Sequence, residues 1–261
     1  MSKPYILCSP SSSGLSLALV RRFLTSTQLP VIATARSDLS TVKDKILDGL
    51  KVDSSRITML QVDFLEEATI KEASNQVKDI LGKNNYLRLG MIAPGILLNP
   101  EKTPQQIDHE DTMRTFQINT IGPMLAIKHF SSFLPNRNTK LDKAEGLPDV
   151  AVWATMSARV GSIGDNKLGG WFAYRASKAA VNQVSKTFQN NLSMTKRPAI
   201  SVTLHPGTVK THLSRDFWES TKPEKLFTPE FSAERLHGVI QNLTPDDGGG
   251  QFDWKGDAIP Y

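Results

Sequence analysis

VAVWATM at residues 150–156 and YRASKAAVNQVSKTFQNNLS at residues 174–193 are a short apolar run and a long amphipathic pattern, in that order along the chain. The first is rich in β-favouring side chains over the length of a strand, and the second repeats its apolar positions with the period of a helix. A strand followed by a helix is the unit from which parallel sheets are built.

The same alternation runs through all 261 residues. Apolar runs that predict strands lie at residues 5–8, 31–35, 57–62, 87–92, 150–156, 200–204 and 251–254. Patterns that predict helices lie at residues 15–26, 39–50, 66–81, 111–133, 174–193 and 232–242. This order predicts a doubly wound α/β fold, with helices on both faces of a parallel sheet. Because we find no internal repeat and no low-complexity linker, we expect residues 1–261 to form a single domain.

Two segments interrupt the alternation. Residues 136–148 are polar and predict a solvated loop. Residues 208–229 lie between the sixth strand and the last helix and carry Phe217, Trp218 and Phe227 in an irregular pattern. We interpret this second segment as a flap that covers the substrate.

The composition is that of a globular protein, with 39% hydrophobic and 22% charged residues. No stretch approaches the roughly 20 apolar residues that span a membrane, and CSPSSSG at residues 8–14 breaks the first apolar run, so we expect a cytoplasmic protein. The formal charge of +5 comes from scattered residues, which does not indicate nucleic-acid binding. Cys8 is the one cysteine, which excludes an intramolecular disulfide and predicts a buried small side chain.

Tyr174 and Lys178 stand four residues apart at the start of a predicted helix. Residues at this spacing share one helical face, so the phenol lies beside the ammonium group. A neighbouring cation favours the phenolate and brings the tyrosine closer to the range of an acid/base catalyst. Such a pair also occurs on ordinary helix faces, where the tyrosine is half-buried core and the lysine is solvated.

Three further features favour the catalytic interpretation. Ser157 follows the strand at 150–156, at the carboxyl edge where ligands of open α/β sheets bind, and its hydroxyl is a donor for a substrate oxygen. Asn119 interrupts an apolar helical stretch, where a buried amide needs partners. Residues 205–211, HPGTVKT, form a turn after the sixth strand at the same edge.

With these residues in place, the sequence resembles the classical short-chain dehydrogenase/reductase family, and within it the C-factor-like relatives of carbonyl reductases. The resemblance covers nearly the whole chain and implies a Rossmann fold that binds NADP(H). It implies that Tyr174 protonates the carbonyl oxygen, that Ser157 orients it, and that Lys178 lowers the pKa of Tyr174 and holds the nicotinamide ribose. By the same resemblance Asn119 positions a water beside Lys178, and four residues lie next to the nicotinamide: Pro206, Gly207, Val209 and Thr211.

The cofactor loop departs from the family pattern. The family shows Thr-Gly-x-x-x-Gly-x-Gly after the first strand, whereas residues 9–16 read SPSSSGLS and keep only the middle glycine, Gly14. Pro10 removes a backbone donor, and Ser16 adds a side chain where the helix approaches the strand. Backbone N–H groups and serine hydroxyls nevertheless remain as donors for the pyrophosphate. We therefore assign the phosphates to Ser9, Ser11, Ser13, Gly14 and Leu15.

The remaining cofactor contacts follow the next three strands. Ala35 stands where an NAD-specific protein has a carboxylate, and Arg36 offers a cation to a 2′-phosphate, which favours NADP(H). The resemblance places Asp63 beside the adenine; otherwise it is a loop or cap residue. The Asn-Asn-Ala-Gly of the family reads IAPG at residues 92–95, in which Gly95 still lets the backbone pass the adenine ribose.

The substrate is expected to be a small molecule with apolar or aromatic parts. The loop before Tyr174 and the predicted flap supply candidate pocket residues, although the aromatic ones also suit a core or an interface. These candidates are Asp165, Trp171, Phe172, Phe217 and Trp218. No metal is expected to take part.

Three functions remain open from the sequence. The first is reduction of a carbonyl, or a related C=N or C=C bond, by hydride from NADPH. The second is a tailoring reductase of secondary metabolism acting on an iminium or fused-ring intermediate, with Asp165 as an extra acid or counter-charge. The third is a regulatory or signalling protein that binds the cofactor without turnover. The family resemblance also implies a homo-dimer or homo-tetramer, packed through the helices at 111–133 and 174–193. The scattered charge and the lack of a long apolar stretch indicate neither nucleic acid nor a membrane as partner.

Overall fold

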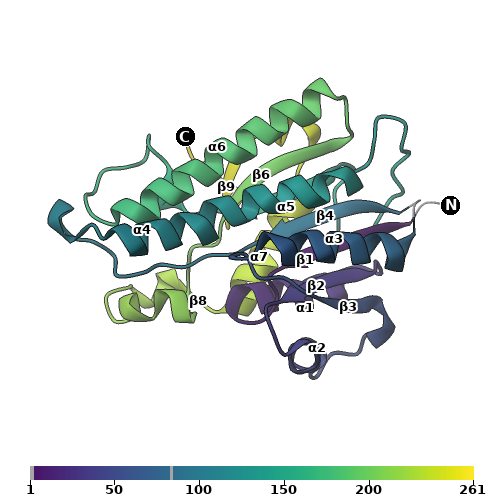
Figure 1. Cartoon of the computed structure of the whole chain (residues 1–261), viewed down its shortest axis with the longest axis horizontal. Helices are drawn as coiled ribbons and strands as arrows, with labels where there is room; N and C mark the ends of the chain where they lie inside the picture. The colour runs from purple at the N-terminus through teal and green to yellow at the C-terminus, as the bar shows by residue number, and fades with distance from the viewer. Residues whose placement is uncertain (1–2, 83–84) are drawn as a thin grey trace.

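The computed structural model describes residues 3–82 and 85–261. Its centre is a seven-stranded sheet in the order β3-β2-β1-β4-β5-β6-β9 (Figure 1). All its strand pairs are parallel. The strands are β1 (Pro4–Ser9), β2 (Val31–Ala35), β3 (Ile57–Gln61), β4 (Tyr86–Ile92), β5 (Ala151–Met156), β6 (Ala199–His205) and β9 (Gln251–Asp253). The predicted doubly wound α/β fold is confirmed, and each predicted strand lies within one or two residues of an observed one.

Helices cover both faces of the sheet, as Figure 1 shows. One face carries α1 (Gly14–Ser26), α2 (Leu39–Leu47) and α7 (Pro229–Gln241). The other carries α3 (Glu67–Leu81), α4 (His109–Phe116), α5 (Gly122–Phe130) and α6 (Phe172–Met194). Two separate clusters of buried apolar side chains fill the layers between sheet and helices.

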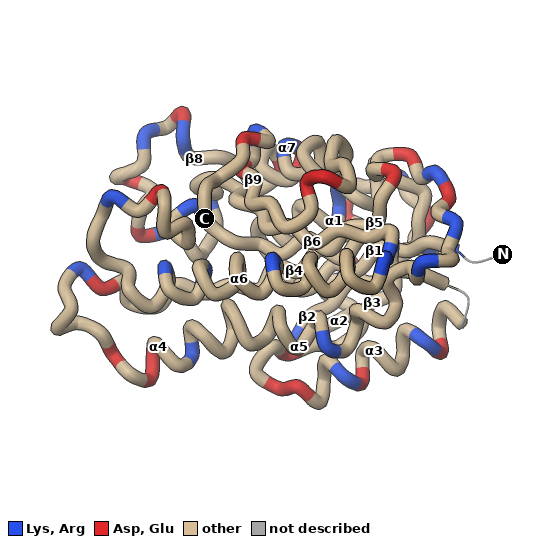
Figure 2. Tube along the Cα trace, turned by 90° about the horizontal axis from the view of Figure 1, so that it is seen from above, with Lys and Arg blue, Asp and Glu red and all other residues tan. Residues whose placement is uncertain are grey.

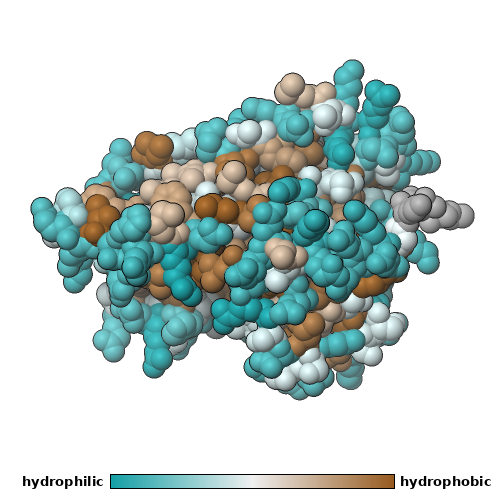
Figure 3. Space-filling view, in the orientation of Figure 1, coloured by the Kyte–Doolittle hydropathy of each residue, from teal (hydrophilic) through white to brown (hydrophobic). Residues whose placement is uncertain are grey.

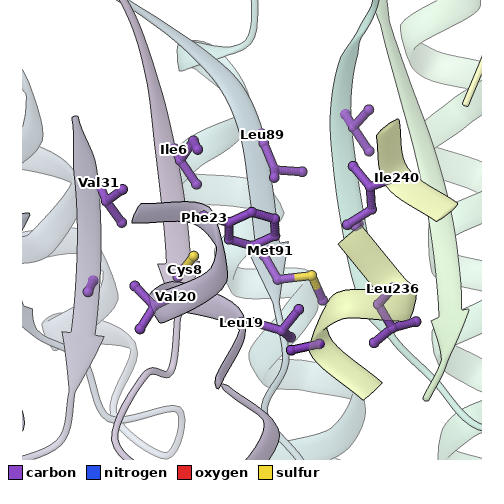
Figure 4. Close-up of a cluster of buried hydrophobic side chains, with 14 of the residues drawn as sticks. Ile6, Cys8, Leu19, Val20, Phe23, Val31, Leu89, Met91, Leu236 and Ile240 are labelled. Carbon is purple, nitrogen blue, oxygen red and sulfur yellow. The ribbon is translucent and has the colours of Figure 1, made fainter. Parts of the chain in front are cut away.

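Figure 4 shows the first of these clusters. Phe23 of α1 and Leu236 of α7 pack against Ile6 of β1 and Met91 of β4, and each of these side chains is almost fully buried. Cys8 lies in the same cluster, and its burial raises the pKa of the thiol, which keeps it protonated and unreactive. The prediction of a buried, structural cysteine is confirmed.

The long helix predicted at 111–133 is divided in the structure. A π-helical turn, η3 (Gln117–Ile121), separates α4 from α5, and a short 3-10 helix, η4 (Ser131–Phe133), follows. Such π-helical turns are common at functional sites. The last helix begins three residues before the predicted start, because Thr228 caps it by accepting a hydrogen bond from the N–H of Phe231.

The segment predicted as a flap is partly regular. Its strands β7 (Thr208–Val209) and β8 (Leu226–Phe227) pair in parallel, and 3-10 helices η6 (His212–Phe217) and η7 (Pro223–Lys225) lie between them. Phe227 anchors the far end, since its ring centroid lies 4.5 Å from that of Trp254. A Cβ on Gly207, whose φ is +77°, would lie 2.6 Å from Phe227, so only glycine allows this close approach.

The predicted loop at 136–148 is exposed over its first part, but its end is buried against the helices. Gly146, Leu147 and Pro148 are buried, and the carbonyl of Gly146 accepts a hydrogen bond from Nε2 of His237 at 2.8 Å. Arg88, fully buried in β4, donates to the carbonyls of Pro148 and Val150. The loop therefore ends as part of the core.

Charged residues of both signs are spread around the chain trace, with no large region of one sign (Figure 2). Among the residues described, no helix is long and apolar enough to cross a membrane.

Because the strands are parallel, their carboxyl ends share one edge of the sheet. Strands β1 and β4 are neighbours at the centre, and the chain order runs outward from them in opposite directions. Ligands of doubly wound proteins bind in the crevice at such a switch point. Ser9, Ser157 and Pro206 directly end or follow strands at this edge.

Candidate active site

Tyr174 and Lys178 lie in the first two turns of α6, and both are almost completely buried. The ammonium nitrogen of Lys178 is 5.8 Å from the centroid of the Tyr174 ring, and it donates a hydrogen bond to the carbonyl oxygen of Met156 at 3.0 Å. The structure thus brings the phenol and the ammonium group together at the end of β5.

Burial sets the protonation of both groups. It raises the pKa of Tyr174 to about 12 and lowers that of Lys178 to about 8. The sequence interpretation expected the lysine to lower the pKa of the tyrosine. In the structure, desolvation of the phenolate has the larger effect and raises that pKa. At neutral pH Tyr174 therefore carries its proton and Lys178 is mostly charged.

Ser157 follows β5 and is buried beside α6. Its N–H donates to the carbonyl of Leu204 at 2.8 Å, which ties it to β6. Its hydroxyl donates to Oδ1 of Asn182 at 2.7 Å. Sequence reasoning missed Asn182, although an amide four residues after Lys178, on the same helical face, was a signal that could have found it.

Asn119 lies in the π-helical turn, with its side chain buried. Its Oδ1 accepts from the N–H of Ile96 at 2.8 Å, and its Nδ2 donates to the carbonyl of Ile96 at 3.0 Å and to the hydroxyl of Ser177 at 3.1 Å. A Cβ built on Gly95 would lie 3.7 Å from the Lys178 nitrogen and 4.0 Å from Asn119 Oδ1. Asn119 therefore fixes the loop after β4 beside Lys178 through Ile96, and its amide also links this loop to α6 through Ser177.

Gly14 lies where the first loop meets the segment after β6. Its φ is +53°, and a Cβ there would lie 3.0 Å from Cγ2 of Thr211. The helix α1 starts at Gly14 without an acidic residue in its first turn and without a side-chain cap from Ser13. The first N–H groups of α1 are therefore free to bind an anion. The pyrophosphate of a dinucleotide fits this helix N-terminus.

The serines of this loop divide into two pairs. Ser9 and Ser11 are buried; the hydroxyl of Ser9 bonds that of Thr34 at 2.7 Å, and the hydroxyl of Ser11 donates to the carbonyl of Cys8 at 2.9 Å. The sequence interpretation assigned Ser9, Ser11 and Ser13 to the pyrophosphate, with serine hydroxyls as additional donors. In the structure the hydroxyls of Ser9 and Ser11 hold the loop to the sheet, which leaves Ser12, Ser13 and the N–H groups up to Leu15.

The other expected cofactor contacts lie along the same edge. Arg36 is exposed directly after β2, and its carbonyl accepts from Gln61 at 3.1 Å. Asp63 forms a turn after β3, with Oδ1 accepting from the N–H of Leu65 at 2.9 Å. Pro206 is fixed by Ser232, whose hydroxyl donates to its carbonyl at 2.9 Å, and Val209 is buried in the small sheet.

Of the five predicted pocket residues, Trp171 lies beside Tyr174, and Phe217 lies beside Trp171. Trp171 lies with its ring centroid 6.2 Å from that of Tyr174 and 4.8 Å from that of Phe217. The three rings form one aromatic wall between α6 and the predicted flap. Phe217 therefore connects the predicted flap to Trp171.

The other three predicted pocket residues have different neighbours. Phe172 is partly exposed on α6, and Trp218 donates from Nε1 to the hydroxyl of Ser214 at 3.0 Å. The carboxylate of Asp165 accepts a hydrogen bond from Arg159 at 2.7 Å. Arg159 also binds Asp253 at 2.9 Å and thereby ties the loop after Ser157 to β9, a role that sequence reasoning missed.

Trp171 has backbone angles of φ 57° and ψ 41°, a left-handed conformation that costs free energy for a bulky residue. Glu101 holds it there. Its carbonyl accepts from the N–H of Trp171 at 2.6 Å, and its buried carboxylate accepts from the N–H of Ala173 at 3.2 Å. Glu101 thus caps α6 at the end that carries Tyr174.

We expect Glu101→Ala to lower the unfolding temperature by a few degrees, since losing a helix cap costs about 1 kcal/mol. Glu101→Gln keeps a carbonyl oxygen for Ala173 and is the matched control. Thermal unfolding followed by circular dichroism measures both. Equal losses in the two variants would show that the charge of Glu101, and not its hydrogen bond, stabilises the helix end.

Within residues 3–82 and 85–261, no group of three or more His, Cys, Asp and Glu side chains is arranged to hold a metal ion. His205, at the end of β6, is neutral because burial lowers its pKa to about 4.

Comparison with known proteins gives relatives of several kinds. No family model matches the chain. It is 37% identical over 144 residues to 1-hydroxy-2-glutathionyl-2-methyl-3-butene dehydrogenase of Rhodococcus sp., a match that spans 55% of each chain. It is 32% identical over 158 residues to the C-signal protein of Myxococcus xanthus, covering 59% of this chain and 81% of that one. The chain thus matches about half the length of the first relative and most of the second.

A solved structure matches over the full length. The NADPH-bound carbonyl reductase from chicken fatty liver superimposes with a TM-score of 0.84, at 25% identity, with 100% of both chains covered.

Proposed function

Because the chain belongs to the short-chain dehydrogenase/reductase family, we propose that it is an NADPH-dependent carbonyl reductase with Tyr174 as its proton donor. The observation that carries this proposal is the buried pair of Tyr174 and Lys178 at the carboxyl edge of the sheet, beside Ser157. The similarity to an NADPH-bound carbonyl reductase supports the choice of reaction and cofactor.

The protonation of the pair suits reduction of a carbonyl. NADPH, when bound, supplies the hydride that adds to the carbonyl carbon. Tyr174, protonated at neutral pH because its pKa is about 12, donates its proton to the carbonyl oxygen. The charged Lys178 stabilises the phenolate that forms, and solvent then returns a proton to it. Ser157 contacts the carbonyl oxygen of the substrate from the side opposite Tyr174.

The proposed cofactor contacts begin at the N-terminus of α1, which starts at Gly14. The N–H groups at the start of α1, together with Ser12 and Ser13, bind the pyrophosphate, and Lys178 and Tyr174 hold the nicotinamide ribose. The segment after β6 borders the nicotinamide through Pro206, Gly207, Val209 and Thr211. At the other end, Asp63 and Gly95 border the adenosine, and Arg36 binds the 2′-phosphate. Asn119 positions a water beside Lys178.

Arg36→Asp is expected to weaken NADPH binding by about tenfold to a hundredfold, because a charge-assisted contact to phosphate becomes a repulsion. NADH lacks the 2′-phosphate, and its dissociation constant should change less than about threefold. Fluorescence titration of the reduced nicotinamide measures both constants. Lys71→Asp, which makes the same change of charge on the exposed face of α3, is the control. If the affinities for NADH and NADPH fall equally, Arg36 does not bind the 2′-phosphate.

The aromatic wall of Trp171, Phe217 and Tyr174 favours a substrate with an aromatic or apolar group next to the carbonyl. The segment 208–229 then acts as the flap over the substrate, anchored by Phe227 and reaching the site through Phe217. A panel of aromatic and aliphatic ketones and aldehydes, assayed by the loss of NADPH absorbance, tests this preference. Turnover of aliphatic substrates alone would contradict it.

Two other functions were open from the sequence. For an iminium reductase, Asp165 was the suggested counter-charge, but its carboxylate is paired with Arg159. For a regulatory protein without turnover, the similarity to a protein named C-signal is the favouring observation. A pure cofactor binder does not require a protonated Tyr174 beside a buried cation, so we favour the enzyme.

The enzyme is further proposed to be a homo-dimer or homo-tetramer in the cytoplasm. Met113 of α4, Met124 of α5 and Phe172 of α6 are exposed apolar side chains. Figure 3 shows apolar atoms along the face occupied by these helices. This is the face through which we expect copies of the chain to pack.

A further inference from the structure

The start of α6 is built on two consecutive residues with a left-handed backbone. Gly170 has a φ of 79°, which glycine adopts freely, but the next residue with a positive φ is Trp171, at 57°. The residue before a helix ordinarily has an extended backbone, and Ser, Thr, Asp, Asn or Gly is favoured there. A bulky tryptophan in the left-handed region meets neither preference. The formation of α6 therefore does not by itself explain this residue or its conformation.

The loop after β4 supplies the contacts that hold Trp171 in this conformation. The carbonyl oxygen of Glu101 accepts from the N–H of Trp171 at 2.6 Å, and its carboxylate accepts from the N–H of Ala173 at 3.2 Å. Only 5% of Glu101 is exposed. A Cβ on Gly170 would lie 2.8 Å from the same carbonyl oxygen, so the close approach of the two segments requires a glycine. Backbone and side chain of Glu101 together thus fix the first residues of α6.

Arg175 fixes the same turn from the helix side. Its Nε donates to the carbonyl oxygen of Gly170 at 3.0 Å, and its Nη1 donates to that of Val160 at 3.5 Å. The four residues before the turn, 166–169, are by contrast exposed. A Cβ on Gly169 would meet no atom of the described residues within 4 Å. The contacts therefore converge on the turn before α6 and not on the loop that leads to it.

The left-handed backbone directs the indole of Trp171 to the aromatic wall. Its ring centroid lies 6.2 Å from that of Tyr174, with 77° between the planes, and 4.8 Å from that of Phe217. The direction of a side chain depends on φ, so an extended or right-handed backbone at this residue would point the indole elsewhere. Strained residues that surrounding contacts hold in place cluster at active sites and ligand clamps. The strain at Trp171 accordingly has a functional reason: it places the indole beside the proton donor.

We propose that Glu101 is a positioning residue which, by holding Trp171 in its left-handed conformation, gives the site a preference for a carbonyl bonded directly to an aromatic ring. This inference rests on the proposed function. A carbonyl that accepts from Tyr174 carries its substituents next to the indole. An indole gains more from packing against an aromatic ring, edge to face or offset, than from packing against a saturated ring of the same size. Glu101 acts through the indole and does not touch the substrate.

Binding to the oxidised complex tests the proposal without turnover. Acetophenone and cyclohexyl methyl ketone differ only in the ring, and neither is reduced when the enzyme holds NADP⁺. Calorimetry gives both dissociation constants, and the wild type is expected to bind the aromatic ketone about fivefold more tightly. Glu101→Ala removes the contact to Ala173, and Gly170→Ala drives the carbonyl of Glu101 away from Trp171. Each should reduce the ratio of the two constants to less than about twofold.

Matched variants separate positioning from general damage to the helix end. Gly169→Ala adds the same methyl group one residue earlier, in open space, and should leave the ratio unchanged. Glu101→Gln keeps an acceptor for Ala173 and should preserve the ratio. In a Trp171→Leu background, Glu101→Ala should have no further effect, because its effect passes through the indole. A ratio that Glu101→Ala and Gly170→Ala leave unchanged, or that Glu101→Ala lowers equally with and without Trp171, would overturn the proposal.

Fluorine NMR of protein labelled with 5-fluorotryptophan gives a second readout that needs neither substrate nor reaction. Trp171→Phe identifies the resonance of Trp171 among those of the four tryptophans. Glu101→Ala and Gly170→Ala are expected to shift this resonance, and Glu101→Gln and Gly169→Ala to leave it in place. A resonance that the first two variants do not move would overturn the positioning role. If the resonance and the ratio of dissociation constants behave as expected but no carbonyl is reduced, the proposed reaction fails while the role of Glu101 stands.

Discussion

Tyr174→Phe is expected to lower kcat for carbonyl reduction by about three orders of magnitude, within the range that a positioned proton donor contributes. The ring keeps its place against Trp171, but the proposed proton donor, which is protonated at neutral pH, is lost. The rate is measured from the oxidation of NADPH at saturating ketone.

Binding and stability should hardly change in this variant. The dissociation constant of NADPH is expected to stay within about threefold of the wild type, because the ring and Lys178 remain. Trp171→Phe, which alters the same aromatic wall and leaves the phenol in place, is the control for packing. If Tyr174→Phe keeps more than a tenth of the wild-type kcat, another group supplies the proton.

Lys178→Met should abolish most of the activity and at the same time make the protein more stable at pH 7. Burial lowers the pKa of this lysine from 10.5 to about 8, which corresponds to about 3 kcal/mol of destabilisation while the group is charged. Methionine fills a similar volume without a charge and leaves the carbonyl of Met156 without its donor, at a cost of about 1 kcal/mol. We expect a net gain of about 2 kcal/mol in the free energy of unfolding.

The pH dependence identifies the cause of that gain. Between pH 8 and 10.5 the unfolded chain still holds the proton of Lys178 while the folded protein has released it. The unfolded state then binds more protons, so raising the pH stabilises the folded wild type. The advantage of Lys178→Met should therefore be largest below pH 8 and shrink as the pH rises toward 10.5.

Urea unfolding of both proteins at several pH values measures this difference. Lys186→Met, a substitution at an exposed position of the same helix, serves as the control and should show no such trend. A constant difference between wild type and Lys178→Met across this range would mean that burial of the charge is not what destabilises the wild type.

The alternation of apolar runs and amphipathic patterns was enough to predict the sheet, because the strands of a parallel sheet are covered by helices on both faces and are therefore mostly apolar. The break of the helix at 111–133 was not predictable in the same way. The π-helical turn at Asn119 accompanies hydrogen bonds to Ile96, a residue from another part of the chain. The pattern of apolar residues along the helix carries no information about a hydrogen-bond partner that is distant in the sequence.

The same reason limits what the sequence revealed of the site. Tyr174 and Lys178 were found because their spacing alone places them on one helical face. Gln251 was not found, since its contact with Asn182 joins residues 69 positions apart. Ser9 and Ser11 were assigned to phosphate because hydroxyls are good donors, yet both turn inward to satisfy Thr34 and the backbone of Cys8.

Transfer of deuterium from labelled NADPH tests the central claim most directly. The protein is incubated with NADPH carrying deuterium at the hydride position and with aromatic and aliphatic carbonyls, and the products are analysed by mass spectrometry. The account predicts an alcohol with deuterium on its carbinol carbon, formed by the wild type and almost absent with Tyr174→Phe. If no carbonyl in the panel yields a deuterated alcohol, or if Tyr174→Phe forms it as fast as the wild type, the account is contradicted.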